Sequence, residues 1–336
     1  MRDYTRYIGL DYHDDQIQAC VLDAAGQVLA NRRCPNDWQA LAAMVEPGVS
    51  VQAALEAGSG TADLAQQLTE KAGWSVSLAH SRYVAKLKQS PDKTDVSDAH
   101  LLGDLTRVGY LPRSWQPPQY IRELRKLVRY RQQLADQRRA MKLRIQSIRR
   151  EHRLHEQPAN AWTKAWIDWL AHHPDLPEAS RWLIHELLEE IDHVNGKIRR
   201  VHDRMRAWTA NDAAVEKLLN LPGVGEVTAW GLLAAVGRFD RFKSGKALAR
   251  YCGLSPRNAS SGQKQREGGL IGEADPKLRA LLIQAGHRLA NTPHSRWGPL
   301  AGRLRQQGKA QSVVVAAVTN RWLRWVYHQM VCETEL

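Results

Sequence analysis

The first 110 residues alternate short apolar runs with stretches in which apolar residues recur at helical spacing. The short runs have the length and composition of strands, and turn residues separate them, with His13-Asp14-Asp15 as the first predicted turn. We expect five strands, at residues 5–12, 16–23, 27–34, 49–56 and 74–79. Helical spacing predicts helices at residues 37–46, 61–72 and 94–109. The order is therefore three strands, helix, strand, helix, strand, helix.

This order is typical of an α/β ribonuclease H-like (RuvC-like) domain, which we assign to residues 1–112. A linker is predicted after it, because Pro112, Pro117 and Pro118 interrupt regular structure. The pattern after the linker is mainly helical, with a helical coiled-coil middle region at residues 119–209 and a mainly α-helical C-terminal domain at residues 213–336.

A long basic helix is predicted at residues 119–155, with 12 Lys and Arg against 3 Asp and Glu. Apolar residues recur in it every seven positions, at Leu127, Leu134, Met141 and Ile148. Arg131 and Arg138 interrupt the companion row of this heptad pattern. A second helical stretch from Ala179 to about Trp208 predicts an antiparallel hairpin.

The basic helix has two compatible interpretations. The heptad row favours a coiled coil that dimerises, whereas the charge favours a surface that binds nucleic-acid phosphates, with Arg149 and Arg150 as candidate contacts. Charge reversal of both arginines distinguishes them, because weaker nucleic-acid binding with intact oligomerisation would favour the phosphate-binding surface.

The segment Leu221-Pro222-Gly223-Val224-Gly225 is typical of a helix-hairpin-helix. Gly223 and Gly225 permit a tight turn, and free backbone N–H groups at the start of the following helix bind phosphate without reading sequence. The alternative is an ordinary glycine-containing turn between two helices.

Composition indicates a polyanionic partner. The net charge is +13 and the pI is about 9.8, and no apolar run approaches the roughly 20 residues that span a bilayer, so nucleic acid is favoured over a membrane. The four cysteines are scattered, which argues against a zinc site. We therefore expect a cytoplasmic, nucleoid-associated protein.

An acidic N-terminal part stands out in this basic chain. Residues 1–100 contain 9 Lys and Arg against 13 Asp and Glu, a net charge of −4. Asp11 lies in the first predicted strand, Glu56 ends the fourth, and Asp95 and Asp98 share one face of a helix. Central strands place their ends close together in such a sheet and the helix can pack across them, so we expect the four carboxylates to converge. Clustered carboxylates repel one another unless cations neutralise them, and such oxygen ligands select Mg²⁺ or Mn²⁺. Taken singly, each carboxylate has a structural alternative, such as balancing a helix dipole.

A serine-rich segment follows in the C-terminal region, at residues 253–272. Its hydroxyl and basic side chains are Ser255, Arg257, Ser260, Ser261, Lys264 and Arg266. Composition alone favours a surface loop that contacts phosphates. A nucleophilic serine would need activation, and no base is identifiable from the sequence.

Motifs at both ends of the chain together resemble the IS110 family of transposases. GLDYH, LEAGSG and KTDVSDAHLL are similar to the family's DEDD domain, and LLNLPGVGEV with GLSPRNASSG is similar to its transposase domain. The resemblance implies that Asp11, Glu56, Asp95 and Asp98 bind metal. It also implies that Ser261, with Ser260 as its neighbouring alternative, attacks DNA and forms a phosphoserine link.

The resemblance further implies partners. These are donor and target DNA, a guide RNA (the bridge RNA) in some members, and a dimer that assembles to a tetramer, in which the metal site of one subunit meets the serine of another. Glu273 and Asp275 depart from the family's usual Ser/Thr-Lys-rich pattern after the serine, which puts the local phosphate contacts in question.

Two other functions compete with a recombinase. A RuvC-like nuclease would hydrolyse branched DNA with its carboxylates and water, without Ser261 and without a protein–DNA adduct. A non-enzymatic nucleic-acid-binding protein would leave the four carboxylates without a role, and its binding would survive chelation.

Overall fold

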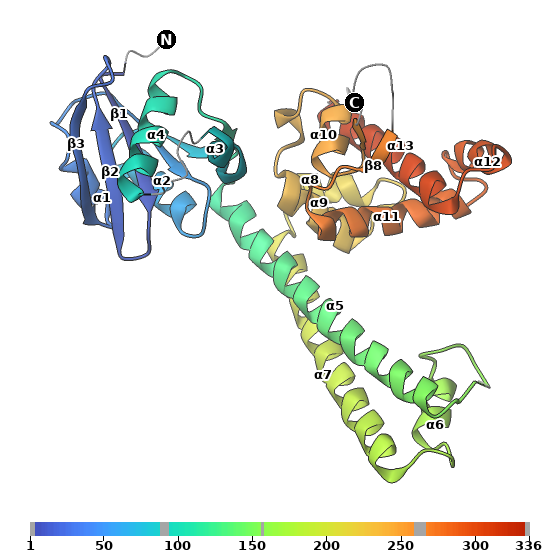
Figure 1. Cartoon of the computed structure of the whole chain (residues 1–336). Coiled ribbons are helices and arrows are strands. Elements are labelled where there is room, and N and C mark those ends of the chain that lie inside the picture. The colour runs from blue at the N-terminus through green and yellow to red at the C-terminus, as the bar shows by residue number, and fades with distance from the viewer. Residues whose placement is uncertain (1–3, 88–93, 156–157, 259–266, 333–336) are drawn as a thin grey trace. The chain divides into compact units, whose positions relative to one another are not determined.

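The computed structural model describes residues 4–87, 94–155, 158–258 and 267–332. The chain forms two compact units, Met1–Pro118 and Gln119–Leu336, each considered by itself (Figure 1). The predicted middle and C-terminal regions both belong to the second unit.

A six-stranded mixed sheet forms the centre of the first unit. Its strands are β1 (Arg6–Tyr12), β2 (Gln16–Leu22), β3 (Val28–Pro35), β4 (Val51–Glu56), β5 (Ser75–Ala79) and β6 (Arg113–Ser114). They lie in the order β3-β2-β1-β4-β5-β6. The β1–β4 and β4–β5 pairs are parallel, and the other neighbours are antiparallel. The five predicted strands are confirmed to within two residues, and β6 was not predicted.

Four helices accompany the sheet: α1 (Trp38–Ala42), α2 (Thr61–Lys71), α3 (Ser81–Leu87) and α4 (Asp95–Arg107). The side chains of β1 alternate between two buried faces. Ile8 and Leu10 pack in one apolar cluster with Leu64 and Leu68 of α2, whereas Gly9 faces the backbone of α4. Both faces of β1 are therefore covered, which explains why its run is apolar throughout. This α/β architecture is compatible with the predicted ribonuclease H-like fold.

An antiparallel helical hairpin opens the second unit. Its long helices are α5 (Gln119–Glu151) and α7 (Glu178–Trp208), with the short α6 (Lys164–Ala171) between them. Arg131 bonds to His202 and Arg138 to Asn195, so the contacts advance in opposite directions along the two helices. Further along, Ile145 and Ile148 of α5 share an apolar cluster with residues of α6 and α7. The heptad row is thus partly covered within the chain, and the two arginines that interrupt the pattern bond across the hairpin.

The rest of the second unit is mainly helical, as predicted. It contains α8 (Ala213–Leu219), α9 (Glu226–Val236), the 3-10 helix η1 (Phe239–Arg241), α10 (Gly245–Tyr251), α11 (Pro276–Asn291), α12 (Gly298–Gln306) and α13 (Gln311–Val331). The short strands β7 (Pro256–Asn258) and β8 (Glu267–Leu270) pair antiparallel and were not predicted. Trp230 and Trp322 lie in its interior and donate their indole N–H groups to Thr209 Oγ1 and the Pro222 carbonyl. Among the described residues, no helix is long and apolar enough to cross a membrane.

Candidate functional site

Two predicted site residues lie at the same edge of the sheet. β1 and β4 run parallel with Leu10 opposite Leu55, so Asp11 and Glu56 are the next residues of neighbouring strands. Both line an open cavity of about 380 Å³, together with His13, Asp14 and other residues that follow the strand ends. The parallel register of two central strands therefore places these carboxylates together.

A close backbone contact brings helix α4 to this edge. A Cβ atom on Gly9 would lie 1.8 Å from the Ala99 carbonyl oxygen and 2.4 Å from the Gly103 nitrogen, so only glycine allows α4 to approach β1 this closely. Asp95 precedes Ala99 by one helical turn, and Asp11 follows Gly9 on the same face of the strand. The N-terminus of α4 therefore lies beside the end of β1.

Local sequence fixes where α4 begins. Thr94 is its N-cap, and a capping box joins Thr94 with Ser97. Asp95 and Asp98 fall in the first turn, where the helix dipole favours negative charge. Asp98 is 6% exposed, whereas the Asp95 side chain is partly exposed toward the site.

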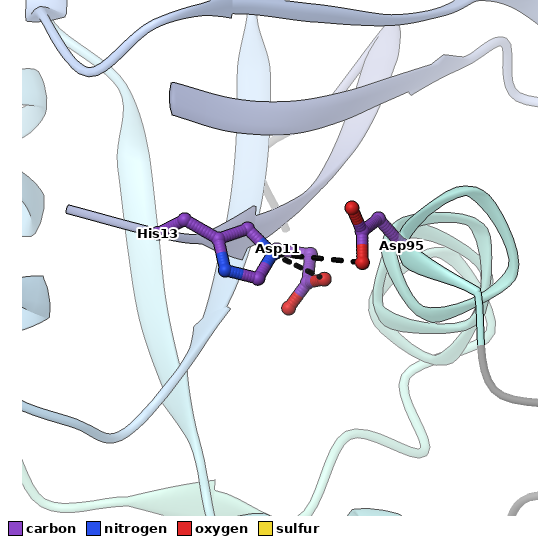
Figure 2. Close-up of side chains that lie close together, drawn as sticks. All are labelled: Asp11, His13 and Asp95. Atoms are coloured by element: carbon purple, nitrogen blue, oxygen red, sulfur yellow. Dashed lines mark ion pairs between the residues drawn. The ribbon is translucent and has the colours of Figure 1, made fainter. Parts of the chain in front are cut away.

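Asp11, His13 and Asp95 converge at this edge (Figure 2). His13 Nε2 lies 3.4 Å from Asp11 Oδ2 and 3.6 Å from Asp95 Oδ1. One potential ligand atom from each residue lies within 4.8 Å of the others. We call these three residues the Asp–His–Asp cluster.

Arg33 holds the second oxygen of Asp95, with its guanidinium nitrogen 2.9 Å from Oδ2. Arg33 pairs with Gln18 across β2–β3, and Gln18 pairs with Asp11 across β1–β2, so all three residues face α4. The buried Gln18 also donates to Asn31, which donates to the Val96 carbonyl in the first turn of α4. β2 and β3 therefore tether the helix end that carries Asp95.

The structure brings the four predicted carboxylates to one region without joining all of them. Asp11 and Asp95 belong to the Asp–His–Asp cluster, and Glu56 lines the cavity beside Asp11. Asp98 lies one turn further along α4 and is buried. Carboxylate oxygens with an imidazole nitrogen form a donor set that suits a divalent cation, so the residues present fit a metal site.

Sequence reasoning missed His13, because His13-Asp14-Asp15 was interpreted as a turn. The turn is real, since β1 ends at Tyr12 and β2 begins at Gln16. The available signal was the spacing in GLDYH, which puts His13 two residues after Asp11 and on the same face of an extended chain.

The predicted serine segment, residues 253–272, contains both β7 and β8. Ser260, Ser261, Lys264 and Arg266 fall in residues 259–266, outside the described part of the chain. Of the flanking residues, Ser255 is partly buried and Arg257 is exposed. Asp275, one of the departures from the family pattern, caps α11 by accepting from the Lys277 and Leu278 N–H groups. Its carboxylate therefore has a structural role.

The glycine turn connects α8 to α9. Gly223 has φ +84°, a conformation that favours glycine, and Gly225 is the N-cap of α9. Glu226 in the first turn of α9 forms a bidentate ion pair with Arg206 of α7, at 2.7 and 2.8 Å. The hydrogen bonds from Arg206 lower the pKa of Glu226. This end of α9 therefore carries a carboxylate that is already neutralised, and phosphate binding there stays a prediction.

The two arginines at the end of α5 differ in their surroundings. Arg149 is half-buried and donates to the Leu154 carbonyl at 2.7 Å and to Gln146 at 2.9 Å. Arg150 is exposed and donates to the Gln146 carbonyl of its own helix at 3.2 Å. Substitution of Arg150 alone is therefore the cleaner test of nucleic-acid contact.

Comparison with known sequences gives matches over both units. A family model of the DEDD type, described as a transposase, matches residues 8–152. A second model, described as a transposase of the IS116/IS110/IS902 family, matches residues 215–298. Together they cover about two thirds of the chain.

Individual relatives agree with these models. A probable family 20 transposase of Pseudomonas aeruginosa is 31% identical over 47% of this chain and 48% of its own length. The transposase for an insertion sequence element, IS1328, of Yersinia enterocolitica is 27% identical over 45% of this chain and 47% of its own. A pilin gene-inverting protein of Moraxella bovis is 31% identical over 33% of this chain and 34% of its own. The chain thus spans about half the length, or less, of the curated relatives it matches.

Proposed function

The chain belongs to the IS110 family of transposases, and from this premise we propose that it is a recombinase that cuts and rejoins DNA. The observation that carries the proposal is the convergence of Asp11 and Asp95 beside Glu56 at an open edge of the sheet. These elements lie within the range matched by the DEDD-type transposase model. Carboxylates gathered from three separate elements are costly to maintain unless they bind a cation.

A divalent ion, Mg²⁺ or Mn²⁺, would be held by Asp11 and Asp95, with Glu56 and Asp98 completing the predicted set. When bound, such an ion neutralises charge on a phosphodiester and polarises its phosphorus–oxygen bonds. The chain's own contribution is to hold these carboxylates in place before DNA arrives. The Gly9 contact with α4 and the Arg33–Asp95 ion pair perform that task.

Ser261 is the proposed nucleophile, with Ser260 as the alternative. Its Oγ attacks a DNA phosphorus, the bond from phosphorus to a deoxyribose oxygen breaks, and the departing hydroxyl takes up the proton that serine loses. A hydroxyl from another strand then reverses the step, joins the DNA and restores the serine. Because a phosphoester bond is kept throughout, rejoining needs no external energy source. The pairing of β7 with β8 supports this proposal, since these strands flank the residues that include Ser260 and Ser261 in the sequence.

The proposed partners follow from the family and from charge. They are donor and target DNA, a bridge RNA, and further copies of this chain in a dimer or tetramer. The net charge of +13 supports binding to polyanions of this kind. The exposed arginines of α5, such as Arg150, are candidate phosphate contacts.

A covalent-adduct assay tests the proposal. Protein with RNA from its own locus is mixed with labelled donor and target DNA and Mg²⁺, then denatured and separated on a gel. We expect a labelled protein–DNA band that disappears in Ser261→Ala and in Asp11→Asn, but persists in Ser255→Ala. Full recombination by a verified Ser261→Ala protein would exclude this serine as the nucleophile and direct attention to Ser260.

Hydrolysis without a covalent intermediate is the second candidate. It is favoured by one observation, that the Asp–His–Asp cluster and Glu56 all lie within residues 1–118 and so do not require the serine segment. The same assay separates the two functions. Cut DNA without any adduct, together with full activity in Ser261→Ala, would support a metal-dependent nuclease.

A further inference from the structure

The imidazole of His13 points between two carboxylates that come from different elements (Figure 2). Asp11 belongs to β1 and Asp95 to α4, and Nε2 lies within 3.6 Å of an oxygen from each. The His13 side chain is 55% exposed. The ring is therefore only partly packed, and its contacts with the two carboxylates are consistent with its orientation.

The distances from His13 Nε2 to the two carboxylates suit neighbouring ligands of one ion. Two ligand atoms at about 2.1 Å from a metal and at a right angle to each other are about 3 Å apart. The distances of 3.4 and 3.6 Å from Nε2 to the two carboxylate oxygens lie only slightly above that value. The three potential ligand atoms all lie within 4.8 Å of one another, so a contraction of the cluster would bring them into one coordination shell.

Arg33 leaves one oxygen of Asp95 available for this shell. Its guanidinium bonds to Oδ2, whereas Oδ1 is the oxygen that faces His13. A carboxylate held in this way presents a single oxygen in a fixed direction, as ligands positioned by a second layer of hydrogen bonds do.

We propose that His13 is a direct ligand, through Nε2, of the divalent ion held by Asp11 and Asp95, and that it makes the site prefer Mn²⁺ to Mg²⁺. This inference rests on the proposed function, which places an ion at these carboxylates. Mg²⁺ takes oxygen ligands almost entirely, whereas first-row transition ions accept imidazole nitrogen readily. Replacing one oxygen donor by nitrogen therefore costs Mg²⁺ more than Mn²⁺.

Mn²⁺ binding to the full chain tests the proposal without relying on activity. Electron paramagnetic resonance measures free Mn²⁺ in a titration, and its pulsed form detects a nitrogen nucleus coupled to the bound ion. We expect His13→Asn to lose the nitrogen coupling and to bind Mn²⁺ about tenfold or more weakly. Mg²⁺ affinity, measured by competition against Mn²⁺, should change much less. His80→Asn is the matched control, because His80 is also exposed and follows β5, a strand of the same sheet that runs parallel to β1.

Two results would overturn the proposal while leaving the metal site intact. One is Mn²⁺ binding that depends on Asp11 but shows no nitrogen coupling in the wild-type chain. The other is a coupling and a Mn²⁺ affinity that persist unchanged in a folded His13→Asn protein. If Mn²⁺ binding is unaffected by Asp11→Asn, or absent from the wild-type chain, the metal centre of the proposed function fails and the His13 proposal fails with it.

Discussion

Repulsion among carboxylates is the main electrostatic feature of the candidate site. Asp11, Asp95 and Glu56 come from three elements to one edge of the sheet. Arg33 offsets the charge of Asp95 through one oxygen. His13 lies between Asp95 and Asp11 and contributes no full positive charge unless it is protonated. The site therefore carries excess negative charge that a divalent ion would remove.

Asp11→Asn should separate the stability of the chain from its response to metal. In chelator, we expect an unchanged or slightly raised melting temperature, because the substitution relieves repulsion among carboxylates. Mn²⁺ should raise the melting temperature of the wild-type chain, by mass action on the folded state, and should no longer do so in Asp11→Asn. Thermal unfolding with and without Mn²⁺ measures both effects.

Asp15→Asn serves as the matched control for that experiment. Asp15 is exposed in the same β1–β2 turn and does not line the cavity. It should keep the full response to Mn²⁺. An equal loss in both variants would mean that the response reports general charge and not a site at Asp11.

At the scale of elements, the contact between β1 and α4 positions the site. The contact exists because Gly9 has no side chain, and the Ala99 carbonyl occupies the space that a Cβ would need. Glycine in the middle of a strand is normally unfavourable, so its presence in an otherwise apolar run indicates a close backbone approach. The site depends on this contact because α4 carries Asp95 and Asp98.

Gly9→Ala should push α4 away from the sheet. We expect a loss of about 2–3 kcal/mol in the free energy of unfolding of the first unit, the cost typical of overpacking a core. Hydrogen exchange of the β1 amides measures this locally, and Mn²⁺ affinity should fall as Asp95 moves. Gly58→Ala should change stability by less than about 0.5 kcal/mol, since its Cβ would meet nothing nearer than 3.8 Å. Equal protection in the two variants would contradict the role assigned to Gly9.

The helical hairpin of the second unit allows a similar comparison, between a buried and an exposed side chain of α5. Ile145 is fully buried in the cluster that joins α5 to α6 and α7, whereas Leu143, two residues earlier, is 55% exposed. Ile145→Ala should lower the free energy of unfolding by about 2–4 kcal/mol, and Leu143→Ala by less than about 0.5 kcal/mol. Urea unfolding followed by tryptophan fluorescence measures both. A comparable loss for Leu143→Ala would mean that this exposed face, which lies outside the predicted heptad row, is covered in solution.

Elements with a strong periodic pattern could be predicted from the sequence, and short ones could not. The apolar runs of β1 to β5 and the repeat of α5 gave their positions to within a few residues. β6, β7 and β8 have two to four residues, too few to show an alternation. Arg131 and Arg138 interrupt the heptad pattern, yet they bond across the hairpin to His202 and Asn195, partners that only the register of α7 reveals.

Some residues of the candidate site could likewise be predicted from the sequence, and others could not. Asp11 and Glu56 could be placed together from sequence, because neighbouring parallel strands end at one edge. The position of Asp95 depends on the Gly9 contact and on the tether from β3, which are tertiary features. His13 was not predicted as a site residue, because a histidine before two aspartates is typical of a turn. His13 belongs both to this turn and to the Asp–His–Asp cluster.

At the scale of the whole molecule, charge is divided unevenly along the chain. Residues 1–100 carry a net charge of −4 with 9 Lys and Arg against 13 Asp and Glu, so the other 236 residues carry +17. Nucleic-acid affinity should therefore come mainly from the second part of the chain and weaken steeply with salt, since bound phosphates release counterions. The acidic first part should bind nucleic acid well only when a cation occupies its carboxylates.

Removal of the metal ion by a chelator should therefore separate DNA binding from formation of the protein–DNA adduct. With EDTA in place of Mg²⁺, we expect DNA binding in a filter or gel-shift assay to fall by less than about threefold, because most phosphate contacts are made by Lys and Arg. Formation of the protein–DNA adduct should be lost. Arg150→Glu should have the opposite effect, because it changes DNA binding and not the reaction. We expect DNA binding to be weaker and less sensitive to salt. The protein–DNA adduct should still form when the protein is in excess. Adduct formation that persists in EDTA would remove the carboxylates from the chemistry and leave the acidic edge of the sheet without the role proposed for it.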